Sequence, residues 1–325
     1  MALRSWLLAA VAFLTALSQS VQPAQAQTQG WPQRTVKFIV PLGPGSGADM
    51  TARLLAGRLS ESWGKPVVIE NRPGGDGFVA INAFVGARDD HTLLFSPSSV
   101  FTAHPFLYEK LPYDPQDLVP LARVTSTLAG VGVPASLKIA TLAEFVALAR
   151  AEPGKLNWAG ITGALDFVFA GFLHGAGLNV NKIPYRDGVQ ALSDLGEGRI
   201  HAFLTALAVI RPQIEAGKVK LISIANQERA PYAPDVQTAI EGGHPSLTFD
   251  GLVGLFGSRD MSEELRNRIA ADVLAVASDP VVVKQLEANS QLVRPANSSV
   301  FAAAIDVQRS QIDSAAKSLG SKPNR

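Results

Sequence analysis

The stretch VPLGPGSGADMTARLLAGRL, Val40 to Leu59, joins a short apolar run to an amphipathic segment through a glycine-rich loop. The apolar run (35–42) predicts a strand, and residues 48–64 predict a helix that ends at a glycine. Ser46 stands at the N-cap position with Asp49 three residues later, which predicts a capping box. The junction therefore places the first turn of a helix, with its unpaired backbone N–H groups, directly after a strand.

Strand-like and helix-like segments alternate along the rest of the chain. KPVVIENR (65–72) is followed by the loop PGGDG and a helical pattern, and HTLLFSPSS (91–99) ends in small polar residues. A third glycine-containing junction of this kind lies at AGITGALD (159–166). Strands that alternate with helices predict parallel strand pairs and an α/β fold. With 325 residues, 47% of them hydrophobic, the chain is long enough for one large domain or two medium ones.

The first 26 residues form a segment of their own. Arg4 gives a positive start, WLLAAVAFLTAL (6–17) is an apolar run, and Ala24-Gln25-Ala26 is an A-x-A cleavage site. This pattern predicts a secretory signal peptide cleaved after Ala26, and hence a periplasmic location. A transmembrane anchor needs about 20 apolar residues, whereas polar residues follow this run at once.

Composition excludes several classes of function. The chain contains no cysteine, which excludes a lipoprotein anchor, disulfides and a cysteine nucleophile. Arg4 is the only charged residue of the first 26, so 29 basic and 28 acidic residues become equal in number after cleavage. Balanced charge argues against a nucleic-acid partner. The five histidines lack ligand spacing and no G-x-S-x-G motif occurs, so we expect no metal, no cofactor and no catalytic site.

The three glycine-rich loops suggest what the protein holds. A helix start offers free N–H groups and the positive end of the dipole, and glycine allows close approach of an anion. Alternatively, the loops only cap helices and turn the chain. A dinucleotide enzyme is a further alternative, since residues 43–48 fit G-x-G-x-x-A and Glu70 ends the next strand. Pro44 within the loop, the signal peptide and the missing catalytic residues argue against that enzyme.

Several segments together resemble the extracytoplasmic solute receptors of the tripartite tricarboxylate transporter system, the Bug receptors. The resemblance covers nearly the whole mature chain. Its segments are WPQRTVKFIVPLGPGSGADMTARLLA (31–56), VVIENRPGGDGFVA (67–80), LYEKLPYDPQDLVPLARV (107–124), IPYRDGVQALSDLGEGRI (183–200) and IRPQIEAGKVKLISIANQERAPYAPDVQTAIEGG (210–243).

This resemblance implies an α/β, two-lobed periplasmic-binding-protein fold of the type II-like, Venus flytrap kind, with a mixed or parallel sheet flanked by helices in each lobe. The implied first lobe comprises 27–124 and 225–325, and the second comprises 125–224. The resemblance also implies a non-enzymatic receptor that captures a small carboxylate and delivers it to large and small membrane subunits. An orphan receptor that acts as a sensor remains an alternative, and a monomer is the expected state of a clamshell.

Ligand-binding residues are carried over from the family by position. In the first lobe they are Gly45, Ser46, Gly47, Asp49, Gly75, Asp76, Gly77, Ser96 and Ser98. In the second they are Thr162, Gly163, Ala164, Asp166, Tyr185, Arg186, Asp187 and Thr205. Tyr185 could instead be a packing aromatic, and Arg186 a solvated surface charge.

The sequence departs from the family at three acidic positions. Asp166 stands near the position of a family histidine, Asp187 replaces a glycine, and Asp76 replaces a small residue. Extra carboxylates near a cleft disfavour a polyanion such as citrate. We therefore expect a monocarboxylate, or a zwitterion whose amine meets one of the acids.

Overall fold

The computed structural model describes residues 30–161, 163–185, 188–289 and 291–320. The expected signal peptide lies outside this part of the chain. Met1–Gln33 form a separate unit, and Arg34–Arg325 form one compact unit that contains all the strands. None of the helices in the described ranges is long and apolar enough to cross a membrane.

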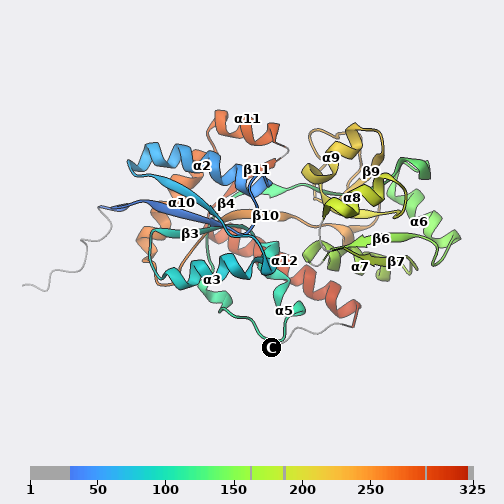
Figure 1. The fold of residues 1–325 in the computed structure, drawn as a ribbon, viewed down its shortest axis with the longest axis horizontal. Coiled ribbons are helices and arrows are strands. Elements are labelled where there is room, and N and C mark those ends of the chain that lie inside the picture. The colour runs from blue at the N-terminus through green and yellow to red at the C-terminus, as the bar shows by residue number, and fades with distance from the viewer. Residues whose placement is uncertain (1–29, 162, 186–187, 290, 321–325) are drawn as a thin grey trace, which may run out of the picture. The chain divides into compact units, whose positions relative to one another are not determined.

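The larger sheet has six strands in the order β11-β4-β10-β3-β1-β2 (Figure 1). Their bounds are β1 Val36–Val40, β2 Val67–Asn71, β3 Thr92–Pro97, β4 Val119–Thr127, β10 Gly251–Gly257 and β11 Gln291–Ala296. Strand β1 pairs in parallel with β2 and β3, as the alternating pattern predicts. Strand β10 is antiparallel to β3 and β4, which makes the sheet mixed. Because β1, β2 and β3 are parallel, the loops that follow them meet at one edge of the sheet.

Helices cover both faces of this sheet, and on one face α3 and α4 pack through a buried cluster. The helices of this part of the chain are α2 Gly47–Trp63, α3 Phe78–Ala87, α4 Ser99–Thr102, α5 His104–Leu107, α10 Glu263–Ala277 and α11 Pro280–Ala288, with the 3₁₀ turns η1 Gly75–Gly77 and η2 Pro115–Asp117. The predicted cap of α2 is confirmed, because Ser46 Oγ accepts a hydrogen bond from the Asp49 N–H. Its predicted end at Gly64, in the left-handed region, is also confirmed. In the cluster, Ile39, Phe84, Leu94 and Phe256 are almost fully buried. Phe106 and Leu107 of α5 pack instead against the other buried cluster, described below.

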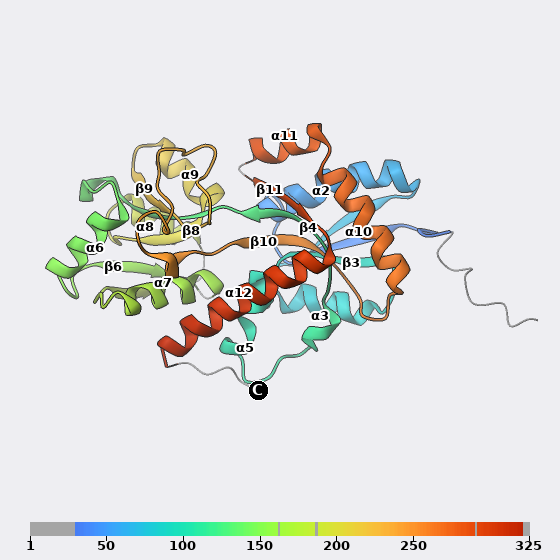
Figure 2. The same ribbon diagram turned by 180° about the vertical axis from the view of Figure 1, so that it is seen from behind.

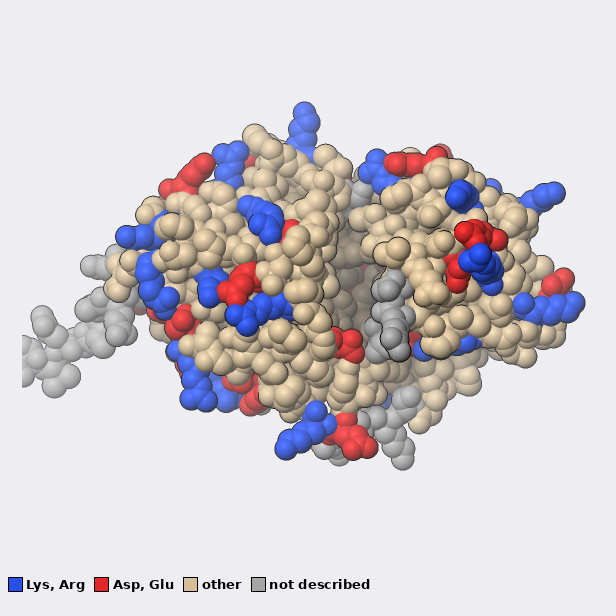
Figure 3. All heavy atoms as spheres, in the orientation of Figure 1, with Lys and Arg blue, Asp and Glu red and all other residues tan. Residues whose placement is uncertain are grey.

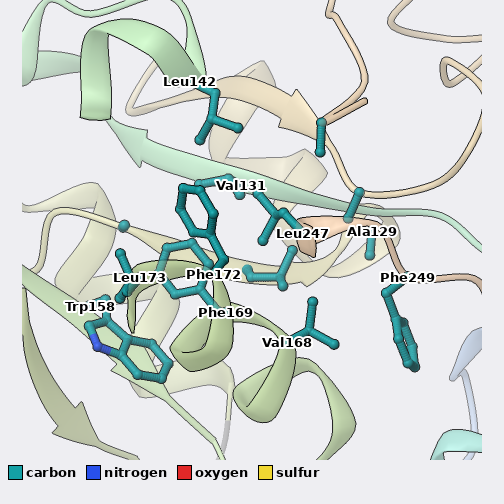
Figure 4. Close-up of a cluster of buried hydrophobic side chains, with 14 of the residues drawn as sticks. Ala129, Val131, Leu142, Trp158, Val168, Phe169, Phe172, Leu173, Leu247 and Phe249 are labelled. Carbon is teal, nitrogen blue, oxygen red and sulfur yellow. The ribbon is translucent and has the colours of Figure 1, made fainter. Parts of the chain in front are cut away.

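Two smaller sheets form the other part of the unit. They are β8-β5-β9, which is antiparallel, and β6-β7, which is parallel. The strands are β5 Ala129–Pro134, β6 Asn157–Gly160, β7 Asn181–Pro184, β8 Phe203–Ala206 and β9 Val219–Ile224. The helical elements are η3 Ala135–Leu137, α6 Leu142–Ala151, α7 Ala164–Gly175, α8 Gly188–Gly196, α9 Leu207–Glu215 and η4 Pro245–Leu247. Figure 4 shows the cluster in which Phe169 and Phe172 of α7 meet Val131 of β5 and Leu247.

The division at residues 124/125 and 224/225 remains a prediction, and strand pairing suggests a different one. Residues 125–127 belong to β4 and pair with β10 and β11. Ala225 and Phe249 lie in the buried cluster around β5 and α7. We therefore propose that the chain leaves the first lobe at Leu128 and returns at Asp250. From here on, the first lobe means 34–127 with 251–311, and the second means 129–249.

Two buried amides fasten the segments that cross between the lobes. Asn226 accepts a hydrogen bond from the Ala129 N–H at 2.8 Å and donates to the Thr127 carbonyl at 3.1 Å. Gln308 donates to the Asp250 carbonyl at 2.8 Å, and its Oε1 accepts from the Ser98 hydroxyl at 2.7 Å. Both crossings are therefore held by side chains from elsewhere in the chain.

The C-terminal helix α12, Ser298–Ser318, packs on both lobes. Its first half buries Phe301 and Ile305 in the cluster of the six-stranded sheet. Its second half buries Ile312 and Ala316 in the cluster around α7. Figure 2 shows α12 running from the larger sheet to α7. This single unbroken helix is thus a third connection between the lobes.

Gly254→Ala should destabilise the protein, because a Cβ on this β10 residue would lie 2.3 Å from the Ala122 carbonyl oxygen and 2.6 Å from the Phe301 ring. Overpacking of this kind typically costs about 1–3 kcal/mol of unfolding free energy. Gly86→Ala is the matched control, because a Cβ on this exposed residue of α3 meets nothing within 4 Å. Urea denaturation of both variants checks this, and equal stability of the two would contradict the packing described.

Candidate functional site

A cavity of about 730 Å³ lies between the lobes. The first lobe contributes residues that follow β1, β2 and β3 at the common edge of the sheet, and the second contributes the ends of β6 and β8 and the start of α7. Figure 3 shows a hollow between the two lobes whose visible walls are mainly uncharged. The lining residues include Pro41, Leu42, Gly43, Gly74, Val100, His104, Leu107, Trp158, Ile161, Leu165, Phe169, Phe203 and Leu204.

The structure brings part of the predicted site together on this wall. Seven predicted residues line the cavity, and they are Gly75, Asp76, Gly77, Gly163, Ala164, Asp166 and Thr205. Seven others are absent from the wall, and they are Gly45, Ser46, Gly47, Asp49, Ser96, Ser98 and Tyr185. Thr162, Arg186 and Asp187 lie outside the described residues.

Asp49 organises the first loop from within rather than facing the cavity. Its side chain is almost fully buried, and Oδ2 accepts hydrogen bonds from the Gly45 N–H at 2.9 Å and from Arg53 Nε at 3.0 Å. Oδ1 accepts from Asn71 Nδ2 at 2.8 Å. Burial raises the pKa of Asp49, but the bonds from Arg53, Asn71 and Gly45 outweigh it and hold the pKa below its ordinary value. In the predicted capping box this carboxylate would accept from the Ser46 N–H, whereas in the structure it accepts from the Gly45 N–H.

Other predicted side chains that do not line the cavity also form hydrogen bonds within the protein. Ser98 Oγ donates to Gln308, and Ser96 Oγ donates to the Pro97 carbonyl. Tyr185 donates to Asp194 at 2.7 Å and packs in the cluster around α8 and α9, as expected for a packing aromatic. These contacts fix the framework of the cleft, and nothing in them offers a free group to a ligand.

Asp76 lies on the turn η1 at the first-lobe wall, in the left-handed region with φ 50°. The Tyr108 hydroxyl donates to its carboxylate. His104, almost fully buried, lies with Nε2 2.9 Å from the Asp76 carbonyl oxygen and Nδ1 2.8 Å from the Tyr113 hydroxyl. A carbonyl only accepts, so Nε2 carries the proton and Nδ1 accepts from Tyr113. Burial lowers the pKa of His104, which keeps this ring neutral.

Asp166 lies in the first turn of α7 at the second-lobe wall. Its Oδ2 is 2.6 Å from Lys182 Nζ, whereas its Oδ1 is buried without a hydrogen-bond partner among the described residues. Burial raises the pKa of Asp166 above its ordinary value, although Lys182 acts in the opposite direction. A buried acceptor with no partner is costly, which marks this position as one that a ligand donor could complete.

The apolar part of the wall was not predicted. Trp158, Phe169 and Phe203 come from β6, α7 and β8, and Leu107 ends α5. Two signals could have found part of it. The apolar segment LNWAGI (156–161) leads into the third glycine-rich loop, and the segment HPFLY (104–108) carries His104 and Leu107.

The structure gives no support to a dinucleotide site at the first loop. Glu70, the expected ribose-binding acid, accepts from Lys37 Nζ at 2.8 Å and pairs with Arg72. These cations hold the pKa of Glu70 below its ordinary value, since Lys37 outweighs the opposing effect of burial and Arg72 adds to it. The carboxylate thus has partners outside the cavity and is absent from its wall.

Comparison with known proteins agrees with this geometry. The model of the tripartite tricarboxylate transporter family receptor matches residues 51–311. Protein BugT of Bordetella pertussis is 31% identical over 246 residues, which are 74% of this chain and 75% of BugT. MatC (Rpa3494) from Rhodopseudomonas palustris with bound malate is 26% identical with a TM-score of 0.71, over 87% of this chain and all of that one. R. palustris Rpa4515 with adipate shares the fold at 24% identity and a TM-score of 0.79, over 90% and 99% of the two chains.

Asp49→Asn should lower the unfolding free energy by about 1–3 kcal/mol at pH 7, because it removes a buried, hydrogen-bonded charge. The folded pKa of Asp49 is depressed, so its contribution is complete above the unfolded value of about 3.9 and is lost as pH falls through the folded pKa. The gap between the two proteins should therefore be constant from pH 7 to 5 and shrink below pH 4. Denaturant titrations at pH 7, 5, 4 and 3 measure it, with the exposed Asp260→Asn as control. A gap that does not narrow in acid would contradict this role.

Proposed function

This chain belongs to the tripartite tricarboxylate transporter receptor family, and from that premise we propose that it captures a small organic carboxylate in the cavity between its lobes. The family consists of periplasmic solute-binding receptors, and the chain is a receptor rather than an enzyme. The candidate ligands are monocarboxylates, dicarboxylates and amino acids. The observation that carries the proposal is a cavity between the two lobes at the carboxyl ends of parallel strands, where open α/β sheets bind ligands.

Backbone N–H groups are the donors that we assign to the carboxylate. Gly74 before η1 and Gly163 before α7 both lack a side-chain cap, and both glycines line the cavity. The first-turn N–H groups of a helix have no partner within it, so a bound anion can supply one. Ser46, in contrast, already caps α2. This difference supports the start of α7, rather than that of α2, as the anion-binding helix start, with the backbone around Gly74 as a further donor.

We further propose that the receptor acts in the periplasm, after cleavage of the signal peptide at Ala26, and works as a monomer. Closure of the lobes on the ligand would present the loaded form to the large and small membrane subunits of a tripartite tricarboxylate transporter. If those subunits are absent, the same closure would serve a sensor. The family membership supports the periplasmic location and the delivery of ligand to membrane subunits.

Binding itself is tested with the protein from periplasmic extract and a panel of mono-, di- and tricarboxylates and amino acids. We expect a one-to-one calorimetric isotherm without turnover. A ligand at about 100 times its Kd should add about 2.7 kcal/mol to the unfolding free energy. If no member of the panel stabilises the protein, the proposed ligand class is wrong.

Ala164→Pro tests the backbone donor. Ala164 is the first residue of α7, where proline keeps the helix but removes one N–H. A hydrogen bond to a charged group contributes about 1.5–3 kcal/mol, so the Kd of the best ligand should rise about tenfold or more. Glu263→Pro makes the same change at the start of α10, which does not line the cavity, and should leave the Kd unchanged. An unaltered Kd in a folded Ala164→Pro protein would exclude this donor.

A further inference from the structure

The charge on the cavity wall narrows the class of ligand that the proposed receptor takes. Among the described residues, the wall contains two acidic side chains, Asp76 and Asp166, and no lysine or arginine. Burial lowers the pKa of the one described histidine on it, His104, and outweighs the opposite effect of its hydrogen bond to the Asp76 carbonyl, so this ring adds no positive charge. Both charged groups that the structure describes on this wall would therefore repel a ligand with several negative charges.

The two acids differ in their partners, and neither is saturated. Asp76 is exposed and receives a hydrogen bond from the Tyr108 hydroxyl, and no ion pair to it occurs among the described residues. Asp166 pairs with Lys182 through Oδ2 alone, and Oδ1 is buried without a partner. Lys182 does not line the cavity. Asp166 thus has acceptor capacity at Oδ1 that no described residue uses, and the exposed carboxylate of Asp76 can accept from a ligand donor as well as from water.

The acids also come from opposite sides of the cleft. Asp76 lies after β2 in the first lobe, and Asp166 lies on α7 in the second. Closure on a ligand brings the two walls together and removes water, which strengthens the interaction between like charges. A positive group on the ligand would turn this repulsion into attraction from both lobes.

Most of the other side chains on the wall are apolar. Trp158, Phe203 and Leu165 contribute to it from the second lobe, and Val100 and Leu107 from the first. Such a surface gains binding free energy from an apolar ligand body at about 25 cal/mol for each Å² buried. It offers few side-chain donors to a second carboxylate.

From these observations, and on the basis of the proposed function, we infer that the ligand is a zwitterion: its ammonium meets Asp166 and Asp76, its single carboxylate meets the backbone N–H groups at the start of α7, and its body is apolar. The chemical class is that of α-amino acids with aliphatic or aromatic side chains.

Matched pairs of compounds test the inference. L-Leucine and 4-methylpentanoate differ only in the amine, as do L-phenylalanine and 3-phenylpropanoate, and malate and adipate serve as dicarboxylates. We expect calorimetry at pH 7 to give at least one amino acid a Kd about tenfold or more below that of its partner without the amine, as one charge-assisted hydrogen bond requires. Both dicarboxylates should bind more weakly still.

Variants locate the effect. Asp166→Asn and Asp76→Asn should each reduce the preference for the amine by about tenfold, while binding of the compound without the amine is unchanged or improved. Glu61→Gln makes the same change of charge on the exposed face of α2 and should leave the preference unaltered. Thermal unfolding checks that each variant is folded. If Asp166→Asn does not fold, the effect of Asp76→Asn on the preference for the amine alone decides the test.

The possible outcomes distinguish failure of this inference from failure of the proposed function. If malate, adipate or a compound without an amine binds at least as tightly as the amino acids, the inference is overturned and the carboxylate receptor stands. The same holds if the amine is preferred but neither aspartate variant reduces the preference. If none of the six compounds binds, both the inference and the proposed capture of such carboxylates fail.

Discussion

Two buried side-chain amides hold the junction on which the cleft depends. Asn226 is hydrogen-bonded to Thr127 and Ala129, where the chain leaves the first lobe. Gln308 is hydrogen-bonded to Asp250, where the chain returns, and to Ser98, which follows β3. Both amides are almost fully buried, so an unmade bond there would cost the full desolvation of its group. The proposed closure would have to keep these bonds and the packing of α12 on both lobes, so we expect it to change the backbone at the crossings rather than to loosen the core.

The sequence predicts the first lobe well because its signals are local. An apolar run followed by a glycine loop and a capped amphipathic segment specifies β1, the Ser46 cap and α2 without reference to distant residues. The return crossing depends on tertiary contacts instead. Residues 225–249 contain no long periodic segment, and only the burial of Ala225, Leu247 and Phe249 against the second-lobe cluster shows where they belong. Likewise, no local pattern could show that one helix, α12, buries its two halves in different clusters.

The candidate site divides in the same way. Glycine positions in loops predict where backbone approaches a ligand, and Gly75, Gly77 and Gly163 do line the cavity. Polar side chains in the same loops are ambiguous, because a carboxylate at the third position of a helix can serve a ligand or its own loop. Asp49 serves its loop, and the competition is decided by Arg53 and Asn71, whose positions depend on the packing of α2 against β2. The aromatic residues of the wall could not be predicted, because in the sequence an apolar residue at the end of a strand looks the same whether it lines a cavity or packs in a core.

The cavity combines weak contributions that become adequate only together. One helix terminus contributes about 0.3–1 kcal/mol, up to ~2 when partly buried, whereas micromolar affinity needs about 8 kcal/mol. The proposed donors at the start of α7 cannot close that difference alone, so on this proposal the apolar wall would supply much of the remainder. On the proposed function, closure of the lobes would bury the apolar body of the ligand and exclude the water that screens Asp76 and Asp166. The two acids would then have their largest effect in the closed state, which would couple the choice of ligand charge to the conformational change that reports binding.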